Sequence, residues 1–277
     1  MANTALVWIR DDFRIQNNDA LTYASNKHDI VTAVFIFNSN IFDHKREAQK
    51  WWVSKSLENF KSDLKKLNIG LEIIKDDEIN FFSKIKSNSK ISVYWNKVYE
   101  PNELEKDKKI GTDFSKKNID FKFFKGNVLN EYNKITKNDG TPFKVYSPFW
   151  RNAEQFYLER LPDKISKVKK CKKINTLFKN QIKSEDILPR SDWYKKFEKY
   201  WVPSEQKAHE NLDNFVNKSI LNYGVDRDFP SIKGTSLLSP YIRNGQINVG
   251  DIWEKCKKLK SNNVSVKKYT NEIGWRE

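Results

Sequence analysis

The chain has 277 residues, of which 38% are hydrophobic and 14% aromatic, enough for two domains with a ring-rich core. Its net charge of +15 favours a nucleic-acid partner, but 42 of the 51 basic residues are lysine, so a bias in base composition is an equal explanation. With no run of 18 apolar residues, no signal peptide, two distant cysteines and three scattered histidines, the sequence predicts a cytoplasmic protein without a membrane span, metal site or Ser-His-Asp triad.

The first part of the chain alternates short apolar runs with helical patterns. The clearest helix covers about residues 44–67, and Gly70 follows it as a stop signal. Strands buried on both faces and separated by helices indicate an α/β domain with a Rossmann-like, doubly wound parallel sheet. No GxGxxG or GxxxxGK[ST] motif follows a strand, which disfavours those nucleotide-binding loops. The predicted strands are residues 5–10, 31–37, 71–75, 91–96 and 119–124.

A polar, lysine-rich stretch over residues 163–191 separates this part from a helical part. We therefore expect an α/β domain over residues 1–130, an interdomain connection over residues 131–200 and the start of an all-α domain over residues 201–277. The α/β domain should fold without the rest, and proteases should cut first within residues 164–183.

The helical part carries clear helix-start signals. Ser204, Ser239 followed by Pro240, and Asn248 are predicted to begin three helices. A last helix begins near Ser265, and the sequence ends within it at Glu277. This predicts a fragment of a longer protein, in which the apolar helix face of residues 266, 269 and 273 is exposed.

A glycine and three hydroxyls precede one of these helices, in the stretch Gly234–Ser239. Hydroxyl groups and free N–H groups at a helix start favour an anion such as a phosphate or pyrophosphate. The alternative is that Thr235, Ser236 and Ser239 only cap helices.

Several motifs carry a resemblance to a known family. "RDFPSIKGTSLLSPYIRNGQI" (227–247) and "NEIGWRE" (271–277) are accompanied, in order, by "LVWIRDDFRIQNNDAL", "YEP", "PFKVYSPFWR" and "WVPSEQKA". Together they resemble the DNA photolyase and cryptochrome family, class I branch, over essentially the whole chain. The resemblance implies a flavoprotein lyase that repairs UV-damaged DNA: photoexcited reduced FAD splits cyclobutane pyrimidine dimers by electron transfer, with no obligate protein partner and a monomeric state.

The resemblance also assigns roles to single residues. Glu272 and Trp275 match residues that contact the dimer and are the catalytic candidates, and Arg227 joins them as a DNA-binding candidate. Tyr269 stands where the family often has Trp. The residues matched to FAD binding are Tyr223, Thr235, Ser236, Leu237, Leu238, Ser239, Tyr269, Glu272 and Arg276.

Asn102 and Glu103 match the pair that binds a second chromophore, the antenna methenyltetrahydrofolate. An amide and a carboxylate can pair with the amino and ring N–H groups of a pterin. The alternative is that both residues only begin a helix.

The sequence departs from the family at its end, because the family continues well beyond the "GWRE" motif. The absent part holds much of the flavin pocket, so the chain alone is expected to be inactive. Two alternatives stay open: a cryptochrome-type blue-light photoreceptor without repair activity, and a stand-alone folate- or nucleotide-binding α/β module.

Overall fold

The computed structural model describes residues 4–40, 47–87, 89–159, 167–173, 176–179, 181–259 and 263–277. By its contacts the chain forms two compact units. The first, here the sheet unit, comprises Met1–Gly126, Ser166–Lys207 and Arg243–Gln246. The second, here the helical unit, comprises Asn127–Ile165, Ala208–Ile242 and Ile247–Glu277.

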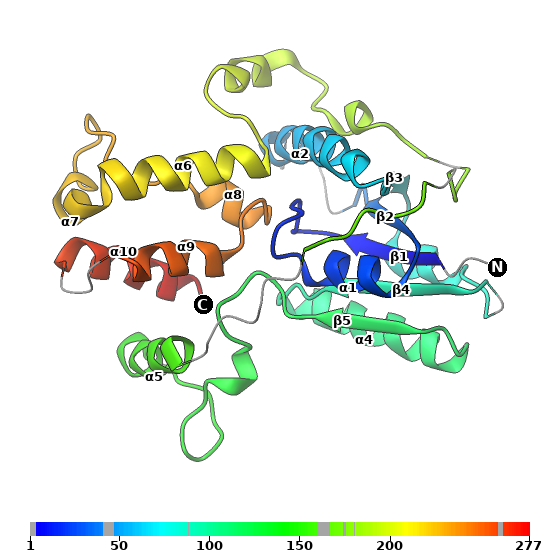
Figure 1. Ribbon diagram of the computed structural model, residues 1–277, viewed down its shortest axis with the longest axis horizontal. Coiled ribbons are helices and arrows are strands. Elements are labelled where there is room, and N and C mark those ends of the chain that lie inside the picture. Colours follow the sequence, from blue (N-terminus) through cyan, green and yellow to red (C-terminus); the bar gives the residue numbers. More distant parts are fainter. Residues whose placement is uncertain are drawn as a thin grey trace. The chain divides into compact units, whose positions relative to one another are not determined.

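The sheet unit holds five parallel strands in the order β3-β2-β1-β4-β5 (Figure 1). The strand order reverses between β1 and β4, as in doubly wound folds. The predicted α/β class is confirmed, and each predicted strand lies within two residues of an observed one. The strands are β1 Thr4–Ile9, β2 Ile30–Phe37, β3 Gly70–Lys75, β4 Ile91–Asn96 and β5 Phe121–Phe124.

Helices cover both faces of this sheet. One face packs against α1 (Asp19–Lys27) and α2 (Glu47–Lys66), which bury apolar residues such as Leu21 and Leu57. The other packs against α3 (Glu78–Ser83) and α4 (Pro101–Lys116) around Trp8 and Trp95. Alternate side chains of one strand point to opposite faces, so continuous apolar runs such as that of β1 supply both layers.

Part of the lysine-rich stretch lies along the sheet unit. The N–H groups of Leu177 and Phe178 donate to the Glu72 carboxylate at 2.7 and 2.9 Å, and the N–H of Ile182 donates to the carbonyl of Ile73 at 2.9 Å. Two 3-10 helices follow, η3 (Ser184–Ile187) and η4 (Asp192–Lys199). The bonds to Glu72 and Ile73 satisfy backbone N–H groups of this stretch.

In the parts that the structure describes, the helical unit contains no strand. Ser204 lies before α6 and accepts from the N–H of Lys207 at 3.2 Å, and Asn248 caps α9 by accepting from Gly250 at 2.8 Å. The last helix begins one residue earlier than predicted and is capped by Asn263. The elements are η2 Tyr132–Lys134, α5 Tyr146–Glu159, α6 Glu205–Lys218 (whose first three residues belong to the sheet unit), η5 Ile220–Asn222, α7 Tyr223–Asp226, α8 Ser239–Arg243 (whose last residue belongs to the sheet unit), α9 Val249–Lys257 and α10 Val264–Arg276.

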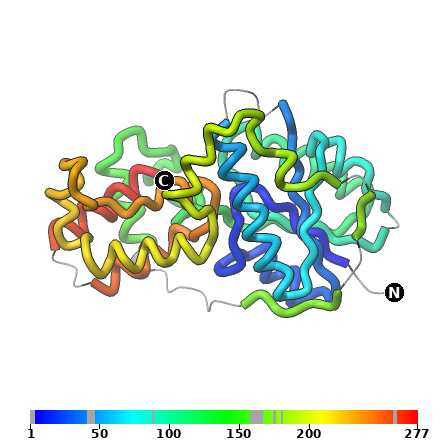
Figure 2. Tube along the Cα trace, turned by 90° about the horizontal axis from the view of Figure 1, so that it is seen from above, coloured from blue at the N-terminus to red at the C-terminus, as the bar shows by residue number. Residues whose placement is uncertain are grey.

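The expected exposed face of the last helix is wrong. Val266, Tyr269 and Ile273 are 6%, 4% and 5% exposed. Their partners precede α10 in the chain: α10 contacts α5, η5, α7 and α9, and Figure 2 shows orange and yellow segments of the same unit beside the red end of the chain. The Glu277 side chain, 3% exposed, accepts hydrogen bonds from the N–H groups of Leu129 and Asn130 at 2.7 and 3.2 Å.

No helix in the described ranges combines the length and apolar character needed to cross a membrane.

Candidate functional site

The predicted residues on α7 and α10 form one continuous cluster within the helical unit. The guanidinium of Arg227 donates to the Glu272 carboxylate at 2.5 Å and lies 5.1 Å over the ring of Tyr223. The Tyr223 ring meets that of Tyr269 edge-on at 5.1 Å. The fold thus brings together four residues that lie up to 49 positions apart in the sequence.

The electrostatics of this cluster favour a charged Arg227. The hydrogen bond to Glu272 raises the pKa of Arg227, so its guanidinium stays protonated. Burial raises the pKa of Tyr223, while the neighbouring Arg227 acts in the opposite direction. The Glu272 side chain is 40% exposed and therefore remains accessible to a ligand.

Trp275 extends the cluster by one helical turn beyond Glu272. It is 64% exposed, and one face of its indole stacks on Tyr146 of α5, with ring centroids 3.8 Å apart and planes within 6° of parallel. Glu272 and Trp275 are three residues apart on α10 and therefore lie on the same side of the helix. A carboxylate, a guanidinium and an open aromatic face are thus available together.

The hydroxyl-bearing loop adjoins the same cluster through Tyr269. Thr235 and Ser239 are exposed, whereas Leu238 is fully buried and its N–H donates to Ser236 at 3.4 Å. Leu237 has a φ of 54°, a left-handed conformation that costs energy in a residue other than glycine.

Tyr269 places a polar atom beside this loop. Ser236 is the neighbouring hydroxyl, yet the Tyr269 hydroxyl has no hydrogen bond of good geometry to any described residue. Burial raises its pKa, which keeps the phenol protonated and able to donate. An unsatisfied buried donor next to exposed hydroxyls fits an anionic group bound at the loop.

Arg276 is the last residue of α10. It is exposed, and its guanidinium approaches the Glu277 carboxylate at 3.4 Å.

Asn102 and Glu103 begin α4 in the sheet unit, near the carboxyl ends of β1 and β4. The two oxygens of Glu103 accept from Arg10 at 3.2 Å and from Lys106 at 2.8 Å. Asn102 is exposed to solvent. A carboxylate offers about four acceptor positions, so two remain for a ligand.

A buried ion-pair network surrounds Glu103. Arg10 also donates to both oxygens of Asp107, at 3.0 and 3.2 Å, and Lys106 donates to Glu78 at 3.0 Å. Burial raises the pKa of Asp107 although Arg10 opposes this. Burial lowers the pKa of Lys106, but its bonds to Glu103 and Glu78 outweigh this effect and raise it. The charged side chains near the carboxyl ends of β1 and β4 are therefore paired with one another.

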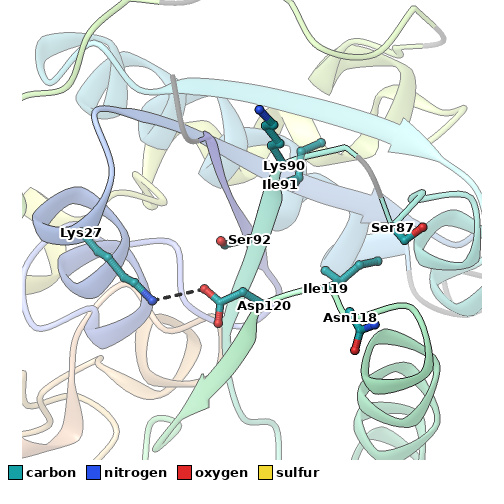
Figure 3. Close-up of a pocket in the computed structure, with 8 residues that line it drawn as sticks. All are labelled: Lys27, Ser87, Lys90, Ile91, Ser92, Asn118, Ile119 and Asp120. Carbon is teal, nitrogen blue, oxygen red and sulfur yellow. Dashed lines mark hydrogen bonds and ion pairs between the residues drawn. The ribbon is translucent and has the colours of Figure 1, made fainter. Parts of the chain in front are cut away.

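A pocket of about 480 Å³ lies at the opposite, amino end of β4 and β5 (Figure 3). Its Asp120 carboxylate pairs with Lys27 at 3.2 Å and accepts from the Tyr94 hydroxyl at 2.9 Å. None of the site residues predicted from the sequence is among the residues that line this pocket. The lining residues are Lys27, Ser87, Lys90, Ile91, Ser92, Asn118, Ile119 and Asp120.

Sequence reasoning missed the residues that support the predicted ones. Arg10 and Lys106 hold Glu103, and Tyr146 backs Trp275. Arg10 lies in "LVWIRDD" and Tyr146 in "PFKVYSPFWR", motifs that carry the family resemblance but do not indicate these contacts. Lys106 lies in neither motif, although its spacing of three residues from Glu103 on one helix permits the pair. A long-range ring stack leaves no local pattern that would have identified Tyr146.

Comparisons with known proteins show the family to which the chain belongs. The family model described as DNA photolyase matches residues 5–167. The chain is 30% identical to a deoxyribodipyrimidine photo-lyase of Agrobacterium fabrum, over 98% of this chain and 57% of that protein. It is 24% identical to cryptochrome-1 of Arabidopsis thaliana, over 99% of this chain and 42% of that protein.

A solved structure shows the same fold. The crystal structure of a bacterial class III photolyase from Agrobacterium tumefaciens superimposes with a TM-score of 0.88 at 29% identity, covering all of this chain and 58% of that one. The chain therefore belongs to the DNA photolyase family. It spans little more than half the length of these relatives, and its assignment to the class I branch stays a prediction.

Proposed function

We propose that this chain is the amino-terminal part of a deoxyribodipyrimidine photolyase, which uses light to split cyclobutane pyrimidine dimers in UV-damaged DNA. The observation that carries the proposal is the cluster on α7 and α10, where the Arg227–Glu272 pair lies one turn from the exposed Trp275. The family membership supports it.

Each residue of the cluster has a role that its chemistry suits. Arg227 binds a DNA phosphate, a contact that weakens as salt rises. Trp275 stacks on a base extruded from the helix, and a damaged pair is extruded more easily than an intact one. Glu272, oriented by Arg227, accepts a hydrogen bond from the flipped base.

FAD is the proposed cofactor, and when bound it supplies the electron that light delivers to the dimer. Thr235, Ser236 and Ser239 hold its phosphates through hydroxyl donors, and the buried Tyr269 hydroxyl is a further donor beside them. Leu237 and Leu238 shape the loop, while Tyr223 and Arg276 complete the proposed set. The Tyr269 ring packs against Phe215 and Tyr223, and these contacts fix its orientation.

The test compares the 277-residue chain with a version extended by the carboxyl-terminal part of the Agrobacterium fabrum relative that the alignment does not cover. Flavin absorbance after purification and loss of dimers from an irradiated oligonucleotide under blue light are measured, with dark samples as control. We expect little flavin and no repair from the short chain, and both from the extended one. Stoichiometric FAD and repair by the short chain would contradict the proposal that it is incomplete, and flavin without repair in the extended chain would favour the cryptochrome function.

We also propose that Asn102 and Glu103 bind the pterin ring of methenyltetrahydrofolate. Glu103 keeps acceptor capacity beyond its bonds to Arg10 and Lys106, and Asn102 is exposed beside it. Purified protein mixed with this folate should gain its near-ultraviolet absorbance.

Two variants separate ligand binding from the ion-pair network. Asn102→Ala removes only an exposed amide and should weaken binding by about two- to tenfold, the loss expected for one hydrogen bond. Glu103→Gln should weaken binding and also lower the melting temperature, because Arg10 and Lys106 lose a charged partner. Unchanged folate binding by Asn102→Ala and Glu103→Gln would refute the assignment.

A further inference from the structure

Tyr146 and Trp275 form a close parallel ring stack in the helical unit. The centroids are 3.8 Å apart and the planes differ by 6°. Aromatic pairs usually prefer offset or edge-on geometry at 4.5–7 Å, so this close parallel contact reflects strong constraint by the surroundings. The rings come from α5 and α10, 129 positions apart in the sequence.

Three contacts hold α5 against α10, one made by Tyr146 and two by Trp150. The Tyr146 hydroxyl donates to the backbone carbonyl of Asn271 at 2.7 Å, and the side-chain oxygen of Asn271 accepts from the indole N–H of Trp150 at 2.9 Å. Gly274 allows the close approach, because a Cβ there would lie 2.5 Å from the Trp150 ring. Helix α5 is thereby held flush against the turn that carries Trp275.

The environment keeps the Tyr146 hydroxyl a donor. Burial raises the pKa of Tyr146 to about 12, and the carboxylates of Glu272 and Glu154 add to the effect. The phenol is therefore neutral at physiological pH and retains its bond to Asn271.

We propose that Tyr146 is a positioning residue that holds the Trp275 indole as a one-sided stacking platform for the extruded base of damaged DNA. This inference rests on the proposed function. Trp275 is 64% exposed, and without a backing ring such a side chain would exchange between rotamers in solvent. With one face covered by Tyr146, the other is presented in a fixed plane, and less conformational freedom is lost when a base stacks on it.

The same geometry makes a specific prediction about selectivity. A stacking platform acts on an extruded base, whereas Arg227 on a phosphate acts on any DNA. Loss of Tyr146 should therefore reduce the preference for damaged over undamaged DNA and leave the affinity for undamaged DNA nearly unchanged.

The experiment uses the 277-residue chain and two fluorescein-labelled oligonucleotides, one with a single thymine cyclobutane dimer and one undamaged, and measures both affinities by anisotropy. Tyr146→Ala should reduce the affinity ratio by about two- to tenfold, the value of one aromatic stack. Tyr146→Phe keeps the ring and should retain most of the ratio. Tyr157→Ala is the matched control, because this tyrosine of the same helix packs edge-on against Trp253.

The double variant distinguishes positioning from a general structural role. If Tyr146 acts through Trp275, then Trp275→Ala abolishes the preference and adding Tyr146→Ala has no further effect. Additive losses, or an unchanged ratio in Tyr146→Ala, would overturn the inference while leaving the proposed function intact. Equal affinity of the unmodified chain for both oligonucleotides would also overturn the inference, whereas the proposed function is decided by the repair assay of the extended chain. Melting curves by circular dichroism identify any alanine variant that fails to fold. If Tyr146→Ala fails to fold, Tyr146→Phe decides: a loss of the affinity ratio as large as that of Trp275→Ala would contradict a role for the ring stack.

Discussion

The candidate sites of the two units differ in the pairing and the solvent exposure of their side chains. In the sheet unit the charged groups near the carboxyl ends of the strands are paired with one another, and Arg10, Glu103 and Asp107 have side chains that are only 9%, 18% and 8% exposed. In the helical unit Arg227 and Glu272 also pair with each other, but Trp275 is 64% exposed, and Thr235 and Ser239 face solvent. A ligand of the sheet unit must bind beside existing ion pairs. A ligand of the helical unit meets an exposed indole, that of Trp275, whose orientation depends on its stack with Tyr146.

The largest expected effect is in the core of the sheet unit. Trp95 is fully buried and packs against Trp8, Phe114 and Phe121. Trp95→Ala should lower the free energy of unfolding by about 3–5 kcal/mol, since it leaves a large cavity. Urea unfolding followed by circular dichroism measures the loss. Phe123→Ala, at a ring that is 45% exposed, is the control, and an equal loss from both would contradict a core centred on Trp95.

A single added methyl group should sharpen the comparison between the units. At Gly274 of the helical unit it would meet the Trp150 ring at 2.5 Å, whereas at Gly70 of the sheet unit its nearest neighbour is Thr32 at 3.9 Å. We expect Gly274→Ala to cost about 1–3 kcal/mol of stability by overpacking. Gly70→Ala should change stability by less than about 0.5 kcal/mol. Thermal melting checks both, and a tolerated Gly274→Ala would show that α5 is not held tightly on α10.

The side chain of Glu277 should stabilise the helical unit. Its buried carboxylate accepts from two backbone N–H groups, those of Leu129 and Asn130. Glu277→Gln keeps the shape but removes the charge and should cost about 1.5–3 kcal/mol, the range for hydrogen bonds to a charged group. Glu185→Gln, at an exposed carboxylate, is the control. Equal melting temperatures for Glu277→Gln and the unmodified chain would contradict this role.

The smallest expected effect is a pH dependence that differs between the units. For Asp120 of the sheet unit, burial raises the pKa, but bonds from Tyr94 and Lys27 outweigh it and lower the pKa. For Asp139 of the helical unit, hydrogen bonds from Thr141 lower the pKa. A lowered pKa contributes stability above the usual Asp range near pH 4, and this contribution is lost as pH falls through the folded-state pKa.

Replacing Asp120 or Asp139 by asparagine should therefore reduce the loss of stability between pH 7 and pH 3. Asp120→Asn should lower the melting temperature at pH 7 slightly and have less effect at pH 3, where the aspartate is losing its charge. Asp139→Asn should show the same sign with a smaller amplitude, because this residue is fully exposed. A melting temperature of Asp120→Asn that falls more at pH 3 than at pH 7 would contradict the assignment.

Local sequence patterns predicted most of the sheet unit and the helix starts of the helical unit. The runs at residues 31–37 and 91–96 are apolar enough to be buried on both faces, and Ser204 and Asn248 cap the helices that they were expected to begin. The family motifs also placed Arg227, Glu272 and Trp275 in one site, and the structure brings Arg227 into contact with Glu272. These features depend on neighbours in sequence or on motif matches.

The sequence by itself determined which strands are buried, where helices begin and which family the motifs indicate, because period, capping and turn chemistry act over a few residues. Only the tertiary structure decided that Val266, Tyr269 and Ile273 are covered, that Arg10 pairs with Glu103, and that Tyr146 stacks on Trp275. Each of these depends on contacts between residues that are distant in the chain. Burial and pairing of that kind follow from how elements pack and have no signature in local sequence.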